Sequence, residues 1–375
     1  MSQHSVRTLR RQVGNTGNLL FIHALRRVLH YDALAHGRRF VPAELADRHD
    51  GIVVAAANWL APRHSFAELA ASIESTQLPC VIVGIGAQAH SEARIPALQD
   101  GVLRLMKIAS ERSHSISVRG EYSAEVLAHY GIDNVTITGC PSLLWNLDAS
   151  HRVEKPQRQV TRVALNCSRG APDERLLTRR ARRVQTNRLN VLLPRLAFQR
   201  GLDFVAQAEL PDIYYALGRP DEDTFATAFA DYMARIYDTT DTSHLNDFLA
   251  HRMKVFVDVE AWLRYLTGQH LVFGTRLHGA IAGLLAGTPS VLVTHDTRTA
   301  EMARQAGIPS VSAEAVTEDT DFQQVYDACD VETFNRSAPA YYQRFAEFFD
   351  ANGLRHRLAG ATESTDGATQ RFPNA

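Results

Sequence analysis

The sequence predicts an α/β protein with two Rossmann-like lobes of mainly parallel sheet that face a cleft. Short β-rich apolar runs alternate with amphipathic stretches, a pattern typical of parallel βαβ units. The alternation occurs in two series, and the polar stretch Asn146–Arg162 between them lacks apolar periodicity and contains Pro156. The length of 375 residues suits about two domains at roughly 100–200 residues each.

The expected strands are short apolar runs that end in small or polar residues: Gly51–Ala57, Cys80–Ile85, Ser115–Val118, Val135–Thr138, Val163–Cys167, Asp203–Gln207, Lys254–Val257, Leu271–Phe273, Ser290–Thr294 and Pro309–Ser312. Helical periodicity lies between them at Asn18–Tyr31, Phe66–Ser75, Ile95–Ser110, Tyr122–Tyr130, Thr224–Tyr237, Val259–Thr267, Leu277–Ala286 and Thr299–Ala306. The arginine-rich stretch Arg175–Arg200 is expected to be a helix or a flap over the cleft.

These elements predict an N-terminal lobe over residues 1–150 and a C-terminal lobe over 160–335. A strong amphipathic helix at Ala340–Asn352, within 336–358, is expected to pack back across the lobes. The small and polar residues of 359–375 predict a disordered tail.

The composition excludes several classes of protein. Lys and Arg number 40 against 41 Asp and Glu, so a non-specific nucleic-acid binder is not expected. No apolar run approaches the ~20 residues of a membrane span and the N-terminus lacks a secretory signal, which predicts a cytoplasmic protein with at most peripheral membrane contact. The cysteines show no metal-ligand spacing, so we expect buried thiols and no metal: Cys80, Cys140, Cys167 and Cys329.

The junction Gly274–Ala280 carries the strongest functional signal. Ligands in open α/β sheets bind at the carboxyl ends of strands, and here Arg276 and His278 follow a buried strand and open a helix. The helix N-terminus attracts an anion, arginine offers a planar fork for carboxylate or phosphate, and histidine can donate a proton near neutral pH. We therefore expect Arg276 and His278 to act with Thr275, Leu277 and Gly279. The alternative is an Arg276 paired with a neighbouring carboxylate and a His278 packed between the lobes.

A second arginine, Arg119, follows the strand Ser115–Val118 of the first series. If both strand ends face one cleft, Arg119 and Arg276 converge on one small ligand with two acidic groups. The alternative for Arg119 is a salt bridge to Glu121 or Glu125.

Other strand ends and turns add candidate ligand-binding residues: Asn15, Gly17, Asn18, Asn58, His295 and Arg298. The turn containing Gly17 and Asn18 could equally be a plain helix-capping turn, and Asp296 or Thr297 could cap the helix after His295. An incomplete glycine motif at Gly84–Gly86 gives only weak support for a dinucleotide site. The acidic groups Asp221–Asp223 and Asp319–Asp321 are expected to be solvated loops.

Three motifs together resemble the polysaccharide pyruvyl transferase family over roughly residues 10 to 310. Gly274–Ala280, followed by Gly287–Val291, is similar to the family's Arg-Leu-His element. Ser117–Arg119 with Tyr122 and Ser123 is similar to its mid-chain arginine motif, and Gly14–Asn18 to its N-terminal Gly-Asn-x-Gly-Asp loop. The chain departs from the family's pattern at four places: Asn18 replaces an Asp, Ala56–Asn58 a Gly-Gly, Gly139–Ser142 an Asp-containing turn, and Arg298 a Lys.

The resemblance implies a GT-B-like fold, with phosphoenolpyruvate as donor, a sugar or lipid-linked oligosaccharide as acceptor, and no cofactor. The products would be a cyclic pyruvate ketal and phosphate. Arg276 and Arg119 would hold the donor and His278 would be the general acid, while the base and the oligomeric state stay open. Two alternatives remain, a GT-B glycosyltransferase that uses a nucleotide sugar and a non-catalytic sugar- or phosphate-binding relative.

Overall fold

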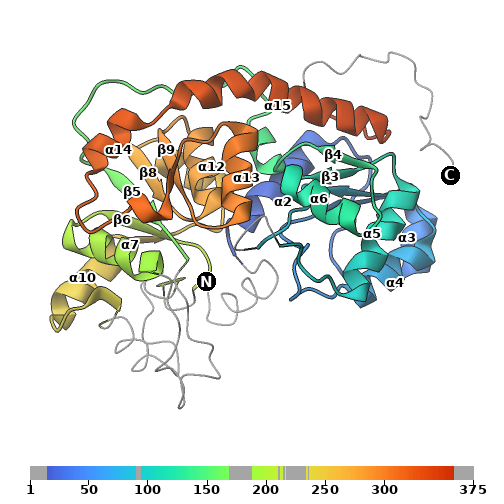
Figure 1. The fold of residues 1–375 in the computed structure, drawn as a ribbon, viewed down its shortest axis with the longest axis horizontal. Helices are drawn as coiled ribbons and strands as arrows, with labels where there is room; N and C mark the ends of the chain where they lie inside the picture. Colours follow the sequence, from blue (N-terminus) through green and yellow to red (C-terminus); the bar gives the residue numbers. More distant parts are fainter. Residues whose placement is uncertain are drawn as a thin grey trace. The chain divides into compact units, whose positions relative to one another are not determined.

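A computed structural model describes residues 15–89, 94–168, 188–209, 212–213, 216, 234 and 236–358 (Figure 1). The tail 359–375, Gly14 and most of the predicted helix Thr224–Tyr237 lie outside the described residues, as does the first half of Arg175–Arg200. The chain divides into two compact units. Unit 1 takes the described residues within Met1–Leu20, Arg152–Thr294 and Ile308–Glu332, and unit 2 takes those within Phe21–His151, His295–Gly307 and Thr333–Ala375.

The units differ from the two continuous lobes, 1–150 and 160–335, that the sequence predicts. Residues 15–20 belong with the later part of the chain because Thr16 N donates to Gln207 O, at 2.8 Å. Residues 295–307 belong with the earlier part, where Thr297 and Glu301 bond to Ala89 and Ser123. How the predicted lobes face each other stays a prediction.

Unit 1 contains a six-stranded parallel sheet in the order β10-β9-β8-β5-β6-β7. Its strands are β5 (Val163–Asn166), β6 (Asp203–Ala206), β7 (Met253–Val255), β8 (Leu271–Gly274), β9 (Ser290–Thr294) and β10 (Ser310–Ser312). The chain starts in the middle at β5, proceeds to one edge, and then returns to β8 on the other side of β5. The strand order therefore reverses between β5 and β8, the point where doubly wound sheets bind their ligands.

The helices of unit 1 are α7 (Arg188–Gln199), α10 (Thr242–His251), α11 (Val259–Leu266), α12 (Leu277–Leu285) and α14 (Phe322–Ala328), with the short turn η4 (Ala313–Ala315). Helix α7 packs on β5 and β6, and α12 on β8 and β9 (Figure 1). All residues of α12 are buried, as is β8. Near-continuous apolar sequence in both elements is what a strand and helix buried on every side require.

Unit 2 has the parallel pairs β1 (Ile52–Ala55) with β2 (Cys80–Val83), and β3 (Ile116–Val118) with β4 (Val135–Ile137). A parallel bridge between Ile85 and Val118 joins the two pairs. The helices are α2 (Asn18–Val28), which begins in unit 1, α3 (Pro42–Arg48), α4 (Ala67–Thr76), α5 (Asp100–Arg112), α6 (Glu121–His129), α13 (Thr297–Ala306) and α15 (Val331–Ala351), with the turn η1 (Pro141–Leu144). Side chains of β2, β3, α4, α5 and α6 form its apolar core.

Helix α15 begins earlier than the predicted Ala340 and passes through Pro339. Within unit 2, Tyr341 Oη accepts from Cys140 N and donates to Cys140 O, and Tyr342 Oη donates to Leu143 O. Asn352 Oδ1 accepts from His114 N at 3.0 Å. These bonds attach the C-terminal helix to elements from the first half of the chain.

The predicted fold class, an α/β protein with parallel sheets, is confirmed. Each predicted strand agrees with an observed one to within two residues at either end. Two helix predictions are wrong at their starts, because α15 begins at Val331 rather than Ala340 and α5 at Asp100 rather than Ile95. Pro96 disfavours helical backbone at the residue before it, and Pro96 O instead accepts from Tyr130 Oη at 2.9 Å.

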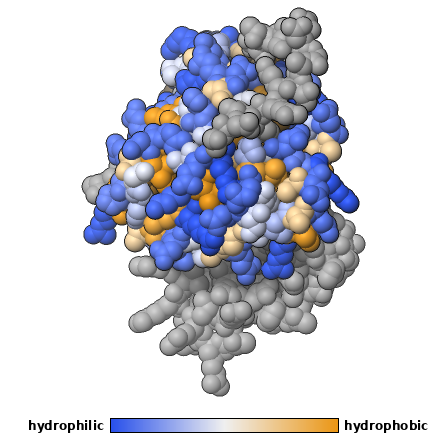
Figure 2. Space-filling model, turned by 90° about the vertical axis from the view of Figure 1, so that its right-hand side faces the viewer, coloured by the Kyte–Doolittle hydropathy of each residue, from blue (hydrophilic) through white to orange (hydrophobic). Residues whose placement is uncertain are grey.

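Figure 2 shows one face on which hydrophilic residues predominate and apolar residues are scattered in small groups. Among the described residues, no helix combines the length and the apolar character that a membrane crossing needs. The four cysteines are buried.

Candidate functional site

Asn166 lies at the switch point of unit 1, where the strand order reverses between β5 and β8. It ends β5, is almost fully buried, and pairs in register with Gly274 at the end of β8. Its backbone oxygen accepts from Thr275 N at 3.0 Å, and its side-chain Oδ1 accepts from Arg276 N at 3.1 Å. A Cβ on Gly274 would lie 1.8 Å from Asn166 O, and one on Gly279 would lie 2.6 Å from Asn166 Cγ. Both glycines are therefore needed for Asn166 to hold the start of α12.

Arg276 is the N-cap residue of α12, and its guanidinium is engaged by a carboxylate. Nη2 donates to Glu209 Oε1 at 2.8 Å, with the two side chains 13% and 7% exposed. The carboxylate-pairing alternative from the sequence is thus observed. The pairing leaves Nε of Arg276 buried without a hydrogen-bond partner.

The N-terminal loop meets the same site. Gly17 N donates to Asn15 Oδ1 at 2.7 Å, and Asn18 N, at the start of α2, donates to Asn15 O at 2.9 Å. A Cβ on Gly17 would lie 3.0 Å from His278 Cβ, so the loop contacts the first turn of α12. Unit 1 therefore brings together predicted residues from both ends of the sequence: Asn15, Gly17, Asn18, Thr275, Arg276, Leu277, His278 and Gly279.

Two polar residues of this site, Gln207 and Glu209, were missed by the sequence analysis. Both are nearly fully buried, and they lie at the first and third positions after β6. The signal that could have found them is their position, since the predicted strand Asp203–Gln207 ends at this edge of the sheet.

Arg119 lies in unit 2, where its side chain joins the ends of three strands. Nε donates to Gly84 O and Nη1 to Asn58 Oδ1, both at 2.8 Å, and Nη2 donates to Ala56 O at 3.5 Å. The residue is 1% exposed. Its partners are thus carbonyl oxygens rather than the Glu121 or Glu125 of the alternative, and contact of Arg119 or Asn58 with a ligand stays a prediction.

The helix that follows Arg119 already has an anion at its N-terminus. Ser123 N and Oγ in the first turn of α6 donate to Oε1 and Oε2 of the buried Glu301, each at 2.9 Å. A Cβ on Gly120 would lie 2.2 Å from Glu301 Cγ. Burial raises the pKa of Glu301, and the Ser123 hydrogen bonds and the charge of Arg119 oppose that rise. A carboxylate of the protein itself therefore occupies the anion position of this junction.

His295 and Arg298 flank Asp296, which caps α13 through a reciprocal capping box with Thr299. Asp296 Oδ2 lies 3.5 Å from Arg298 Nη2 and 3.8 Å from His295 Nε2. Burial by itself would raise the pKa of Asp296, but these two charges and the Thr299 hydrogen bonds lower it. The capping alternative is observed for Asp296, and ligand contact of His295 and Arg298 stays a prediction.

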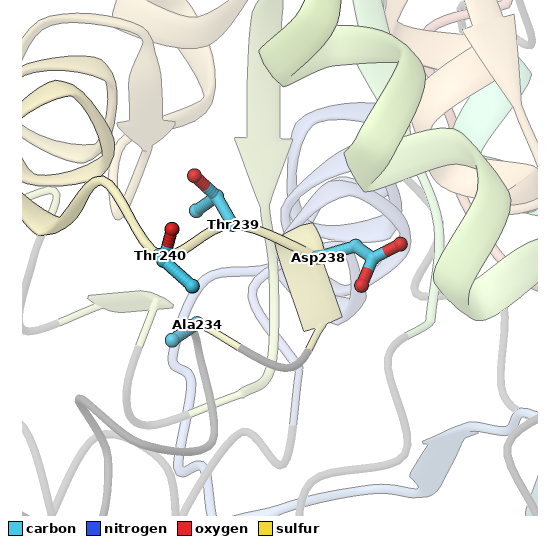
Figure 3. A pocket seen from close by; sticks show the side chains of 4 residues that line it. All are labelled: Ala234, Asp238, Thr239 and Thr240. Atoms are coloured by element: carbon cyan, nitrogen blue, oxygen red, sulfur yellow. The ribbon is translucent and has the colours of Figure 1, made fainter.

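A surface pocket in unit 1 lies among Ala234, Asp238, Thr239 and Thr240 (Figure 3). The carboxylate of Asp238 points away from the two threonines, and it lies 3.6 Å from Arg195 Nη1. These side chains do not converge on one point, so the pocket offers no chemical site. No cluster of three or more metal-ligating side chains occurs in the part of the chain that the structure describes.

Comparison with known proteins identifies the family. The family model of polysaccharide pyruvyl transferases matches residues 15–297, and the chain belongs to this family of transferases. The amylovoran biosynthesis protein AmsJ of Erwinia amylovora is 36% identical over 62 residues, which are 16% of this chain and 15% of AmsJ. The chain thus matches a small part of the length of this curated relative.

Solved structures of two UDP-N-acetylglucosamine 2-epimerases are similar at low sequence identity. The one from Listeria monocytogenes is 11% identical with a TM-score of 0.43, covering 83% of this chain and 77% of that chain. The other is 10% identical with a TM-score of 0.43, covering 90% of this chain and 77% of that chain.

Proposed function

We propose that the protein transfers the pyruvyl group of phosphoenolpyruvate to a hydroxyl pair of a sugar, in a polysaccharide or its lipid-linked precursor. The products are a pyruvate ketal and phosphate. The observation that carries this proposal is the cluster of Asn15, Gly17, Arg276 and His278 at the switch point, within the segment that the family model matches.

The chemistry of the cluster suits an anionic donor. Phosphoenolpyruvate carries a carboxylate and a phosphate, and α12 presents the positive end of its dipole and its first N–H groups. The N–H of Leu277, the first helical residue, has no acceptor within its helix. Arg276 adds a cation whose backbone is held by Asn166. Such a fixed set of donors stabilises charge that develops on the donor during transfer.

The reaction proceeds by addition and elimination. His278 protonates C3 of the donor, C2 takes on oxocarbenium character, and the oxygen of one sugar hydroxyl forms a bond to C2. Phosphate then leaves with the electrons of its C2–O bond, and the second hydroxyl closes the ring. The two hydroxyl protons are balanced by the new C3 methyl hydrogen and by the phosphate. Glu209, which contacts Arg276, supplies a carboxylate of the type that accepts such a hydroxyl proton.

The test is phosphate release from phosphoenolpyruvate with a panel of polysaccharide acceptors. Arg276→Ala and His278→Ala should each abolish release while the thermal unfolding transition stays cooperative. Matched controls are Arg104→Ala, at an exposed ion pair, and His114→Ala, at an exposed side chain, both of which should release phosphate like the wild type. Retained release in both site variants would refute the assignment.

A thermal-shift comparison separates the alternatives. Stabilisation by nucleotide sugars and not by phosphoenolpyruvate would replace the proposal with a nucleotide-sugar glycosyltransferase. Stabilisation by phosphoenolpyruvate with no phosphate release from any acceptor would indicate a binding protein without the reaction.

A further inference from the structure

The side-chain amide of Gln207 is buried without hydrogen bonds. The residue is 1% exposed, and neither Nε2 nor Oε1 has a partner. More than nine in ten buried polar groups in proteins are paired, because an unpaired one loses its hydrogen bonds to water without replacement. An unpaired amide therefore needs a physical explanation at this position.

The amide lies inside the candidate site. The backbone oxygen of Gln207 accepts from Thr16 N at 2.8 Å, which ties the end of β6 to the N-terminal loop. A Cβ on Gly17 would lie 2.6 Å from Gln207 Oε1 and 3.0 Å from His278 Cβ. The absence of a side chain at Gly17 thus leaves room for the Gln207 amide beside the first turn of α12.

A second unpaired group accompanies it. Nε of Arg276 is buried without a partner, although Nη2 of the same guanidinium donates to Glu209. Among the described groups of the site, two donors, Gln207 Nε2 and Arg276 Nε, and the acceptor Gln207 Oε1 therefore have no partner. Ligands that satisfy all three supply both an acceptor oxygen and a hydrogen-bond donor, as an anionic oxygen and a hydroxyl group do.

We propose that Gln207 binds both substrates at this site. Its Nε2 donates to an anionic oxygen of the donor, and its Oε1 accepts a hydrogen bond from the attacking hydroxyl of the sugar. The inference rests on the proposed function for the nature of the two ligands. The amide would then hold the hydroxyl oxygen close to C2 of the donor, which is the positioning that a transfer between two bound molecules needs.

The decisive variant is Gln207→Met, which keeps the unbranched shape and removes both polar atoms. We expect the unliganded variant to unfold at the same or a higher temperature than the wild type, because two unpaired polar atoms are lost. We expect its affinity for phosphoenolpyruvate, measured by calorimetric titration, to fall about tenfold or more. Gln207→Glu, which places a negative charge beside the donor, should lose more affinity than Gln207→Met.

Trp262→Phe is the matched control. Its Nε1 is also buried without a partner, but Trp262 lies on α11 outside the cluster. Removal of that group should leave phosphoenolpyruvate affinity unchanged. A Gln207→Met variant that binds phosphoenolpyruvate like the wild type, while Arg276→Ala does not, would overturn this inference and leave the proposed function standing. A large loss of thermal stability in Gln207→Met would also overturn it, since the amide would then have partners within the protein. Failure of the wild type to bind phosphoenolpyruvate would overturn the proposed function and this inference together.

Discussion

The ion pair between Arg276 and Glu209 gives a prediction whose size follows from the structure. Nη2 and Oε1 lie 2.8 Å apart, and the side chains are 13% and 7% exposed. At an effective dielectric constant of about 20, unit charges at this distance attract by about 6 kcal/mol, of which desolvation offsets a large part. Glu209→Gln leaves the guanidinium buried without a counter-charge, so we expect the free energy of unfolding to fall by about 3–5 kcal/mol.

Removal of both charges should lower the free energy of unfolding less than removal of one. The double variant Glu209→Leu with Arg276→Met has no unpaired buried charge, and we expect its loss of unfolding free energy to be smaller than that of Glu209→Gln. Denaturant unfolding followed by circular dichroism measures each variant. A double-mutant cycle at the exposed pair Arg104–Glu74 is the control, and its expected coupling free energy is below about 1 kcal/mol. Two results would show the reasoning to be wrong. One is a Glu209→Gln variant whose free energy of unfolding falls by less than about 1 kcal/mol, and the other is a double variant whose fall equals the sum of the falls of its two single variants.

Three further predictions concern Glu301, Gly17 and two buried cysteines. The pKa of Glu301 is raised in the folded state, so its contribution to stability is full below its ordinary pKa of 4.5 and is lost as pH rises. In thermal melts from about pH 4 to 7, the melting temperature of Glu301→Gln should therefore rise relative to that of the wild type. A difference that does not change with pH would contradict this prediction. Gly17→Ala should weaken phosphoenolpyruvate binding in a titration while the melting temperature changes little, because the atoms that must move are the ends of the Gln207 and Asn15 side chains. An unchanged affinity would oppose this prediction. Burial raises the pKa of Cys80 to about 12 and that of Cys329 to about 11, so neither thiol should be alkylated in the folded protein at pH 8. Mass spectrometry that finds either cysteine modified would count against their burial.

Strand positions were predictable because each strand is an apolar run that ends in a small or polar residue. The hydrophobic pattern does not predict a helix correctly where the helix has few buried residues or contains a proline. Helix α3 has no buried residue, so its sequence has no apolar face to indicate it. The amphipathic pattern predicts the C-terminal helix only from Ala340. The buried Val331 and Phe334 extend α15 toward its N-terminus through Pro339, although proline removes a helical hydrogen bond. Burial of apolar side chains outweighs one missing backbone bond.

The junction between β8 and α12 in the candidate site was predictable from the sequence, but the residues that contact this junction from other strands were not. Arg276 and His278 are separated by one residue, Leu277, so a local motif reveals them. Asn166, Gln207 and Glu209 reach them only through the sheet order, in which β5 lies between β6 and β8. That order depends on which strands pair, and the sequence of a single strand does not state its neighbours.

The two arginines show why the same local pattern has two outcomes. Both follow a buried strand and precede a helix. The helix after Arg119 receives the Glu301 carboxylate at its first turn, whereas the backbone N–H of Arg276 at the start of α12 donates to the Asn166 side chain. Arg119 lies beside carbonyl oxygens at the ends of β1 and β2, which satisfy its donors within the protein. Arg276 lies at the point where the strand order reverses, in the same cluster as Gln207, whose side-chain amide has no internal partner. A strand-end arginine therefore indicates a ligand site only where the surrounding polar groups are left unsatisfied, and in this chain that condition is met at the junction of β5 and β8.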